Sequence, residues 1–232
     1  MKILALDTAT ENCSVALLID GQLTARERLL ERGHAECILP MIDEVLGEAG
    51  TPLASLTAIA FGRGPGSFTG VRLAASVTQG LAHGSGVPAV PVSDLAAVAQ
   101  RILGDDETAQ RVLVCNDARM REVYWGCFVR SAGGLAGPVG EERVSEPGQV
   151  ALPAGWSAGP ELRGAGTGFA AHPPLRSSFS TILAAIREVH PRAAEVALLA
   201  VSEVTAGRLR SPEDALPVYL RDDVVRPGPA GH

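Results

Sequence analysis

The chain has 232 residues, of which 46% are hydrophobic and 20% are charged, so it is long and apolar enough to bury a core. This composition excludes an intrinsically disordered chain, and the formal net charge of −6 argues against nucleic-acid binding through an overall basic surface. The four cysteines have no C-x-x-C spacing and are too few for a disulfide scaffold, which indicates thiols in a reducing compartment. The sequence offers no secretory signal and no apolar run of about 18 residues, so we expect a cytoplasmic protein without a membrane span.

The N-terminal part of the chain predicts three antiparallel strands. The apolar run Lys2–Leu6 ends at Asp7 and is followed by a polar turn, after which Ser14–Ile19 forms a second run. Asp20-Gly21 is a strong signal for a two-residue hairpin, because both residue types tolerate a positive φ. The third strand is then expected over Gln22–Leu29.

Helices and strands alternate in the next part of the chain. An amphipathic pattern ending at Ala49 predicts a first helix, which either begins near Ile38 or is kinked there, because Pro40 removes a donor. Further elements are expected in the order strand, helix, strand, helix: Ala58–Phe61, Thr69–His83, Pro88–Val92 and Asp94–Leu103, the last with Ser93 as N-cap. Three antiparallel strands followed by this alternation are typical of an α/β, ribonuclease-H-like lobe, in which helices cover both faces of a mixed sheet.

The second half of the chain repeats the beginning of the first. A strand over Val112–Cys115 leads into a polar turn at Asp117, so Asp117 and Asp7 hold equivalent places. This repeat predicts two ribonuclease-H-like lobes, residues 1–106 and residues 107–232. Glycine and proline are frequent between Ala132 and Pro174, which predicts short strands there, and the last helix is expected over Ala193–Thr205.

Two groups of residues could face a nucleotide. Asp7 and Thr8 follow the first strand, and Gly164 and Gly166 lie in a glycine-rich stretch of the second lobe. We expect any nucleotide binding at these four residues to be weak, because Ala9 stands where a phosphate-binding turn usually has glycine. The loop from Gly62 to Arg72 is also rich in glycine, and a tight strand-to-helix connection explains it as well as an anion cradle does.

The first two predicted helices could provide a surface for another protein. The first offers apolar side chains at helical spacing, and the second carries small residues along one seam. The alternative is that both patterns pack against the sheet of the same chain. The residues predicted to form the partner interface are Ile38, Met41, Ile42, Val45, Gly70, Ala74, Val77 and Leu81.

Several motifs along the chain together resemble the TsaB (YeaZ) family. The loop from Gly62 to Arg72 and the stretch Asp117–Tyr124 are its most specific features. Weaker matches come from three other stretches: Leu4–Thr10, Gly33–Glu36 and Pro217–Arg221.

This resemblance implies an actin-like (ASKHA) fold and a non-catalytic role in making threonylcarbamoyladenosine (t6A) on tRNA. The partner TsaD would transfer the threonylcarbamoyl group to the adenosine next to the anticodon, and this chain would bind and support TsaD. The ATPase TsaE would join through the TsaB–TsaD pair, tRNA would be contacted indirectly, and the chain alone would form a homodimer. Asp94 and Val98 stand where TsaD has its two metal-binding histidines, so the resemblance implies no metal, no cofactor and no catalytic residue here.

Two enzymatic alternatives are weaker. An ATP-dependent phosphotransferase of the actin-like class is favoured by Asp7 and by the glycine-rich loops, but Ala9 and the lack of a clear base oppose it. A metallopeptidase would need a ligand set, and the five histidines form no H-x-x-x-H or H-E-x-x-H pair.

Overall fold

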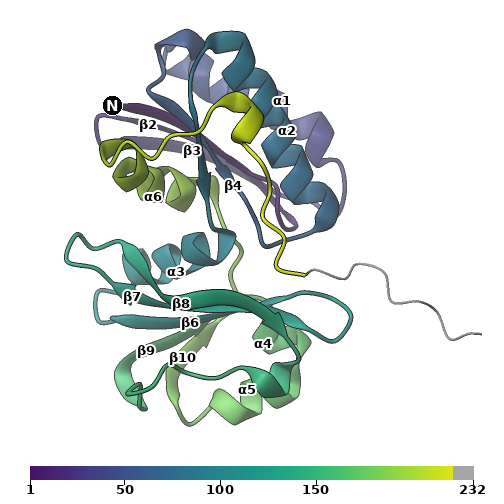
Figure 1. The fold of residues 1–232 in the computed structure, drawn as a ribbon, viewed down its shortest axis with the longest axis vertical. Coiled ribbons are helices and arrows are strands. Elements are labelled where there is room, and N and C mark those ends of the chain that lie inside the picture. The colour runs from purple at the N-terminus through teal and green to yellow at the C-terminus, as the bar shows by residue number, and fades with distance from the viewer. Residues whose placement is uncertain (222–232) are drawn as a thin grey trace, which may run out of the picture.

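The computed structural model describes residues 1–221, whose strands form two five-stranded mixed sheets (Figure 1). In spatial order, the first sheet comprises β3 (Gln22–Leu29), β2 (Asn12–Ile19), β1 (Lys2–Asp7), β4 (Ala58–Gly62) and β5 (Ala89–Val92). The second comprises β8 (Ala136–Ser145), β7 (Val123–Arg130), β6 (Arg111–Asp117), β9 (Gly159–Ala165) and β10 (Leu183–Arg187). In both sheets three antiparallel strands are followed by two parallel ones, so the ribonuclease-H-like order occurs twice and the predicted α/β, actin-like fold is confirmed.

The helices lie in three layers that alternate with the two sheets (Figure 1). The outer face of the first sheet carries α1 (His34–Glu48) and α2 (Phe68–Ser85), and the outer face of the second carries α4 (Gly168–Ala171) and α5 (Pro173–Phe179). Between the sheets lie α3 (Asp94–Asp105) and α6 (Ala193–Thr205). The inner faces of both sheets and these two helices share one continuous apolar core.

Local sequence signals account for most of the elements in the first half. The turn between β2 and β3 has φ values of 48° at Asp20 and 89° at Gly21, as the hairpin signal predicts. The hydroxyl of Ser67 accepts a hydrogen bond from the amide of Gly70 (3.1 Å), which caps α2. Ser93 caps α3 in the same way, through the amide of Ala96 (3.1 Å).

The predicted division into residues 1–106 and 107–232 separates the two sheets but not the helices. Although α3 belongs to the first part of the chain, it packs against the second sheet, through β6, β7, β8 and β9. Conversely, α6 belongs to the second part and packs against β1, β2, β4 and β5 of the first sheet. The physical reason is that each sheet has an apolar inner face, which needs a helix to cover it. We therefore propose that each lobe consists of its own sheet and a helix from the other half of the chain. In this division α6 belongs to the first lobe and α3 to the second.

The segment after α6 returns to the first lobe and then reaches the second. Arg210 pairs with Ala89 at the edge of β5, and the amide of Val218 donates to the carbonyl of Arg63 (2.7 Å). Beyond this point the guanidinium of Arg221 binds Glu122, next to the turn between β6 and β7. This C-terminal segment, residues 210–221, is called the tail below, and it contacts both lobes on the same side of the molecule. The remainder of the predicted second lobe, 222–232, lies outside the described residues.

The structure excludes one of the two alternatives for the first helix and overturns the expectation of short strands after Ala132. The helix begins at His34, before Ile38, and Pro40 lies inside it, on an exposed position. The region rich in glycine and proline contains β8, a strand of 10 residues. Its pairing with β7 supplies backbone hydrogen bonds that outweigh the poor strand propensity, and the ladder shifts register between Trp125 and Cys127.

The exchange of helices predicts that residues 1–106 do not fold alone. In this fragment the inner face of the first sheet lacks α6, so side chains such as Ile3, Ala5 and Ala60 would be exposed to water. We expect no cooperative urea transition for this fragment. A chain that joins residues 1–92 to residues 189–221 by a glycine–serine linker keeps α6 and should unfold cooperatively. A cooperative transition of fragment 1–106 would contradict the proposed lobes.

Candidate functional site

The glycine-rich loop between β4 and α2 packs against the turn between β1 and β2. The amide of Ser67 donates to the carbonyl of Ala9 (2.7 Å), and the hydroxyl of Thr8 donates to the carbonyl of Gly70 (2.7 Å). A Cβ atom at Gly66 would lie 2.6 Å from the carbonyl oxygen of Ala9, and one at Gly70 would overlap the carbonyl oxygen of Thr8. The glycines therefore permit a backbone-to-backbone approach within the chain, which supports the tight connection over an anion cradle.

Asp7 lies at the end of β1 and meets Asp94, the first residue of α3. Both residues are 0% exposed. One oxygen of Asp7 accepts from the amide of Ala9 (2.9 Å), and one oxygen of Asp94 accepts from the amide of Gly64. The two remaining oxygens, Asp7 Oδ2 and Asp94 Oδ1, both lie beside Gly62, where a Cβ atom would overlap both carboxyl groups. The structure thus contains a buried carboxyl pair.

The electrostatic surroundings of this pair disfavour its ionisation. Burial raises the pKa of Asp7 above its ordinary value of 3.8, although hydrogen bonds from Asp94 and Ala9 oppose the shift. For Asp94, burial and then the neighbouring charge of Asp7 raise the pKa well above 3.8. Because both groups are enclosed, the pair is chemically distinct from a solvent-facing catalytic carboxylate.

Sequence reasoning missed the role of Asp94, although two signals for it existed. The predicted N-cap at Ser93 makes Asp94 the first helical residue, directly after the buried strand β5. The ends of the parallel strands β1, β4 and β5 meet at the same edge of the sheet. An acidic residue that follows β5 is therefore brought close to one that ends β1.

The four residues predicted to face a nucleotide do not gather around a common opening in residues 1–221. Thr8 is as deeply buried as Asp7, and its hydroxyl is bound within the chain. Gly164 lies in β9 among core side chains, where a Cβ atom would be 2.6 Å from Leu183. Gly166 belongs to the turn after β9 and packs against Cys115 and Asn116. Weak nucleotide binding by these residues stays a prediction, and their surroundings do not favour it.

Asp117, the equivalent of Asp7 in the second lobe, is more open and lies at the seam between the lobes. Its carboxylate contacts the ring of His172 (3.2 Å) and the guanidinium of Arg119 (3.2 Å). Arg119 also reaches Glu11 in the first lobe (3.3 Å). Three successive residues of this turn, Arg119 to Arg121, have positive φ values of 60°, 51° and 63°. The turn is therefore backbone-strained and joins the lobes through charged side chains.

The structure corrects the residues of the predicted partner surface. Six of the eight are buried between the helices and the first sheet, where they form part of the chain's own core: Ile38, Met41, Ile42, Val45, Gly70 and Ala74. Val77 and Leu81 are partly buried against the same core. An amphipathic pattern indicates a buried face but not what buries it, and here the sheet does. A charge at Ala74 would therefore disrupt the lobe instead of testing a surface.

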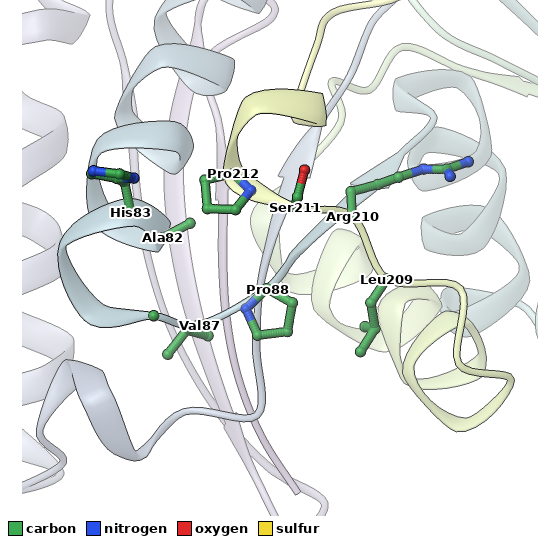
Figure 2. Close-up of a pocket in the computed structure, with 9 residues that line it drawn as sticks. Ala82, His83, Val87, Pro88, Leu209, Arg210, Ser211 and Pro212 are labelled. Atoms are coloured by element: carbon green, nitrogen blue, oxygen red, sulfur yellow. The ribbon is translucent and has the colours of Figure 1, made fainter.

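A shallow pocket of about 450 Å³ lies beside the C-terminal end of α2. Figure 2 shows that Val87, Pro88, Leu209 and Pro212 face it, while the side chain of Arg210 extends away. The hydroxyl of Ser211 donates to Asp214 (2.9 Å) and is not paired with a base. A mostly apolar lining of this kind suits an inserted side chain better than a chemical reaction.

The positions that the resemblance associates with metal binding face the protein core. Asp94 and Val98 are both 0% exposed, and Val98 packs between the two sheets. Within residues 1–221 no three His, Cys, Asp or Glu side chains converge in a way that would hold a metal ion. Over the same residues, every helix is too short or too polar to cross a bilayer.

The packing of the loop predicts opposite effects for two glycine-to-alanine changes in α2. Gly70→Ala should lower the free energy of unfolding by about 2–3 kcal/mol, because its Cβ atom overlaps the carbonyl oxygen of Thr8. Gly80→Ala should raise it by up to about 1 kcal/mol, because a Cβ atom there meets nothing within 4 Å and alanine favours helix. Urea denaturation measures both. Equal effects at the two positions would show that the loop is not tightly packed.

The chain is similar to known proteins along most of its length. Residues 28–216 match the family model of TsaD, tRNA N6-adenosine threonylcarbamoyltransferase. The tRNA threonylcarbamoyladenosine biosynthesis protein TsaB of Escherichia coli is 41% identical over 225 residues, which cover 97% of this chain and 96% of that protein. TsaB of Haemophilus influenzae is 51% identical over 130 residues, 56% of this chain and 55% of that protein.

Two solved structures from Pseudomonas aeruginosa have the same fold. One, described as an uncharacterized protein with similarity to peptidase YEAZ, is 43% identical with a TM-score of 0.88 and covers 95% of this chain and 99% of its own. The other, YeaZ, is 42% identical with a TM-score of 0.84 over 94% of this chain and 99% of its own. Since the likeness in sequence and in structure extends over nearly whole chains, this protein belongs to the TsaB (YeaZ) family of tRNA threonylcarbamoyladenosine biosynthesis proteins.

Proposed function

We propose that this protein is a cytoplasmic, non-catalytic subunit of the complex that makes t6A on tRNA. It binds and supports TsaD, which transfers the threonylcarbamoyl group to the adenosine next to the anticodon. TsaE joins through the pair of this chain and TsaD, and tRNA is contacted indirectly. In the absence of TsaD the chain forms a homodimer.

The observation that carries this proposal is the likeness to E. coli TsaB over almost the full length of both chains. The burial of Asp94 and Val98 is consistent with a supporting role, because both positions are used by the core between the sheets. The burial of Asp7 disfavours the phosphotransferase alternative. In a phosphotransferase this carboxylate would have to reach a nucleotide, and here it is enclosed with Asp94.

The outer faces of α1 and α2 are the surface that we propose for TsaD and for the homodimer. Ser76, Gly80 and Gly84 lie four residues apart on the exposed side of α2, so they form one stripe. A Cβ atom at either glycine would meet open space, so packing within the chain does not require glycine there. Each glycine costs the helix about 1 kcal/mol relative to alanine. Close approach of a partner helix would explain why these positions are small.

Exposed apolar side chains stand at the N-terminal ends of the same two helices. Leu39 on α1 is 48% exposed, and Phe68 on α2 is 52% exposed. The guanidinium of Arg72 stacks on Phe68 and donates to the hydroxyl of Tyr219 (2.7 Å), which ties the tail to this face. Apolar side chains next to a smooth helical stripe, with charged groups around them, are typical of a protein–protein interface.

The biological role predicts a loss of t6A when the protein is depleted. TsaD would lose its supporting subunit, so the modification should decrease in tRNAs that read codons beginning with adenine. Mass spectrometry of digested tRNA measures t6A directly. Unchanged t6A after depletion, in a cell with no second copy of the family, would contradict the role.

The proposed surface predicts that Gly80→Arg weakens binding to TsaD at least tenfold, equivalent to about 1.4 kcal/mol. The side chain would extend into open space in the free protein, so the fold should be retained. Gly104→Arg is the matched control, because Gly104 is also an exposed helical glycine with no atom within 4 Å, but it lies on α3. Titration calorimetry with purified TsaD separates the two variants. Equal affinities would place the partner elsewhere.

A further inference from the structure

The carboxyl groups of Asp7 and Asp94 lie together in the core, where two ionised carboxylates would repel each other. Each group uses one oxygen to accept from a backbone amide, Ala9 for Asp7 and Gly64 for Asp94. The other two oxygens face each other, and within residues 1–221 they have no donor from any other group. Both side chains are 0% exposed, so bulk solvent does not reach them.

Two ionised carboxylates can only accept hydrogen bonds, and they repel each other when they are enclosed. A protonated carboxyl group, in contrast, has one O–H that can donate to the carboxylate opposite. We propose that Asp7 and Asp94 bind a single shared proton in the folded protein, and that this proton fastens the end of β1 to the first turn of α3. Asp94 follows β5 directly, so the proton closes the edge of the first sheet at the point where α3 leaves it to pack against the second sheet.

The groups that face the pair place this proton on Asp94. His34 and His190 lie on the Asp7 side and favour its ionised form, whereas Glu142 lies on the Asp94 side and disfavours ionisation there. Glu142 is itself engaged by the hydroxyl of Ser93 and by Arg63 (3.4 Å). Burial raises the pKa of the Cys13 thiol, also near Asp7, to about 11, so this thiol is neutral over most of the relevant pH range.

A shared proton makes stability depend on pH in a defined direction. In the unfolded chain both carboxyls ionise near pH 4, whereas the folded pair holds its proton to higher pH because its pKa is raised. The folded state therefore binds one more proton than the unfolded state in this window. Stability is highest at the acid end and falls as the pH rises. The unfolding equilibrium constant should increase about tenfold per pH unit until the folded pair ionises.

Asp94→Asn tests the proposal, because the amide can donate to Asp7 and its oxygen can still accept from Gly64. Urea denaturation from pH 5 to pH 10 gives the unfolding constants of both proteins. We expect the ratio of wild-type to variant constants to rise about tenfold per pH unit and then to level off. Asp43→Asn is the control, since Asp43 is exposed on α1, and its ratio to wild type should stay flat. Contributions from titrating groups that lie far from the pair cancel in both ratios.

Two further measurements keep the proposal open to refutation if Asp94→Asn does not fold. Asp7→Asn preserves the same geometry from the other side and should give the same rising ratio. Infrared spectroscopy of the wild type at pH 7 should detect the carbonyl stretch of one buried protonated carboxyl group. Parallel stability curves for the wild type and a folded Asn variant, or the absence of this infrared band, would overturn the proposal.

Discussion

The two sheets are held together by one shared layer of helices, and the other features of the molecule depend on it. Each sheet has an apolar inner face, and α3 and α6 fill the space between the two faces as a single core. Because each helix comes from the opposite half of the chain, neither half can bury its own sheet. The two lobes are therefore packed against each other through this layer of helices.

The same close packing accounts for the groups that resemble a nucleotide site. The backbone of the glycine-rich loop packs closely against the turn after β1. Asp7 is buried with Asp94 where α3 begins at the edge of the first sheet. These residues stabilise the fold and are turned away from solvent. The outer faces of α1 and α2, in contrast, are open to solvent, and α2 presents small residues there. A chain arranged in this way is suited to binding another protein, which agrees with the role we propose.

The order of elements was predictable from the sequence wherever periodicity was strong. Local patterns predict the antiparallel strands, the cap at Ser93 and the repeat of the ribonuclease-H-like order. The cap at Ser67 depends on a local pattern too, but only the structure identifies it. The long strand β8 could not be predicted, because its partner β7 supplies the hydrogen bonds that its glycines and proline disfavour. Burial of Ala74 and the meeting of Asp7 with Asp94 depend on tertiary contacts. Spacing along the chain identifies such residues but does not say what they touch.

We propose that the inner faces of α1 and α2 stabilise the fold and that their outer faces bind TsaD. Amide hydrogen exchange tests this proposal most directly, measured on the protein alone and on its mixture with TsaD from the same organism. Slower exchange confined to amides of α1, α2 and the tail near Tyr219 is the result we expect. Protection of the Arg119–Arg121 turn or of α5, with α1 and α2 unchanged, would contradict the proposed surface.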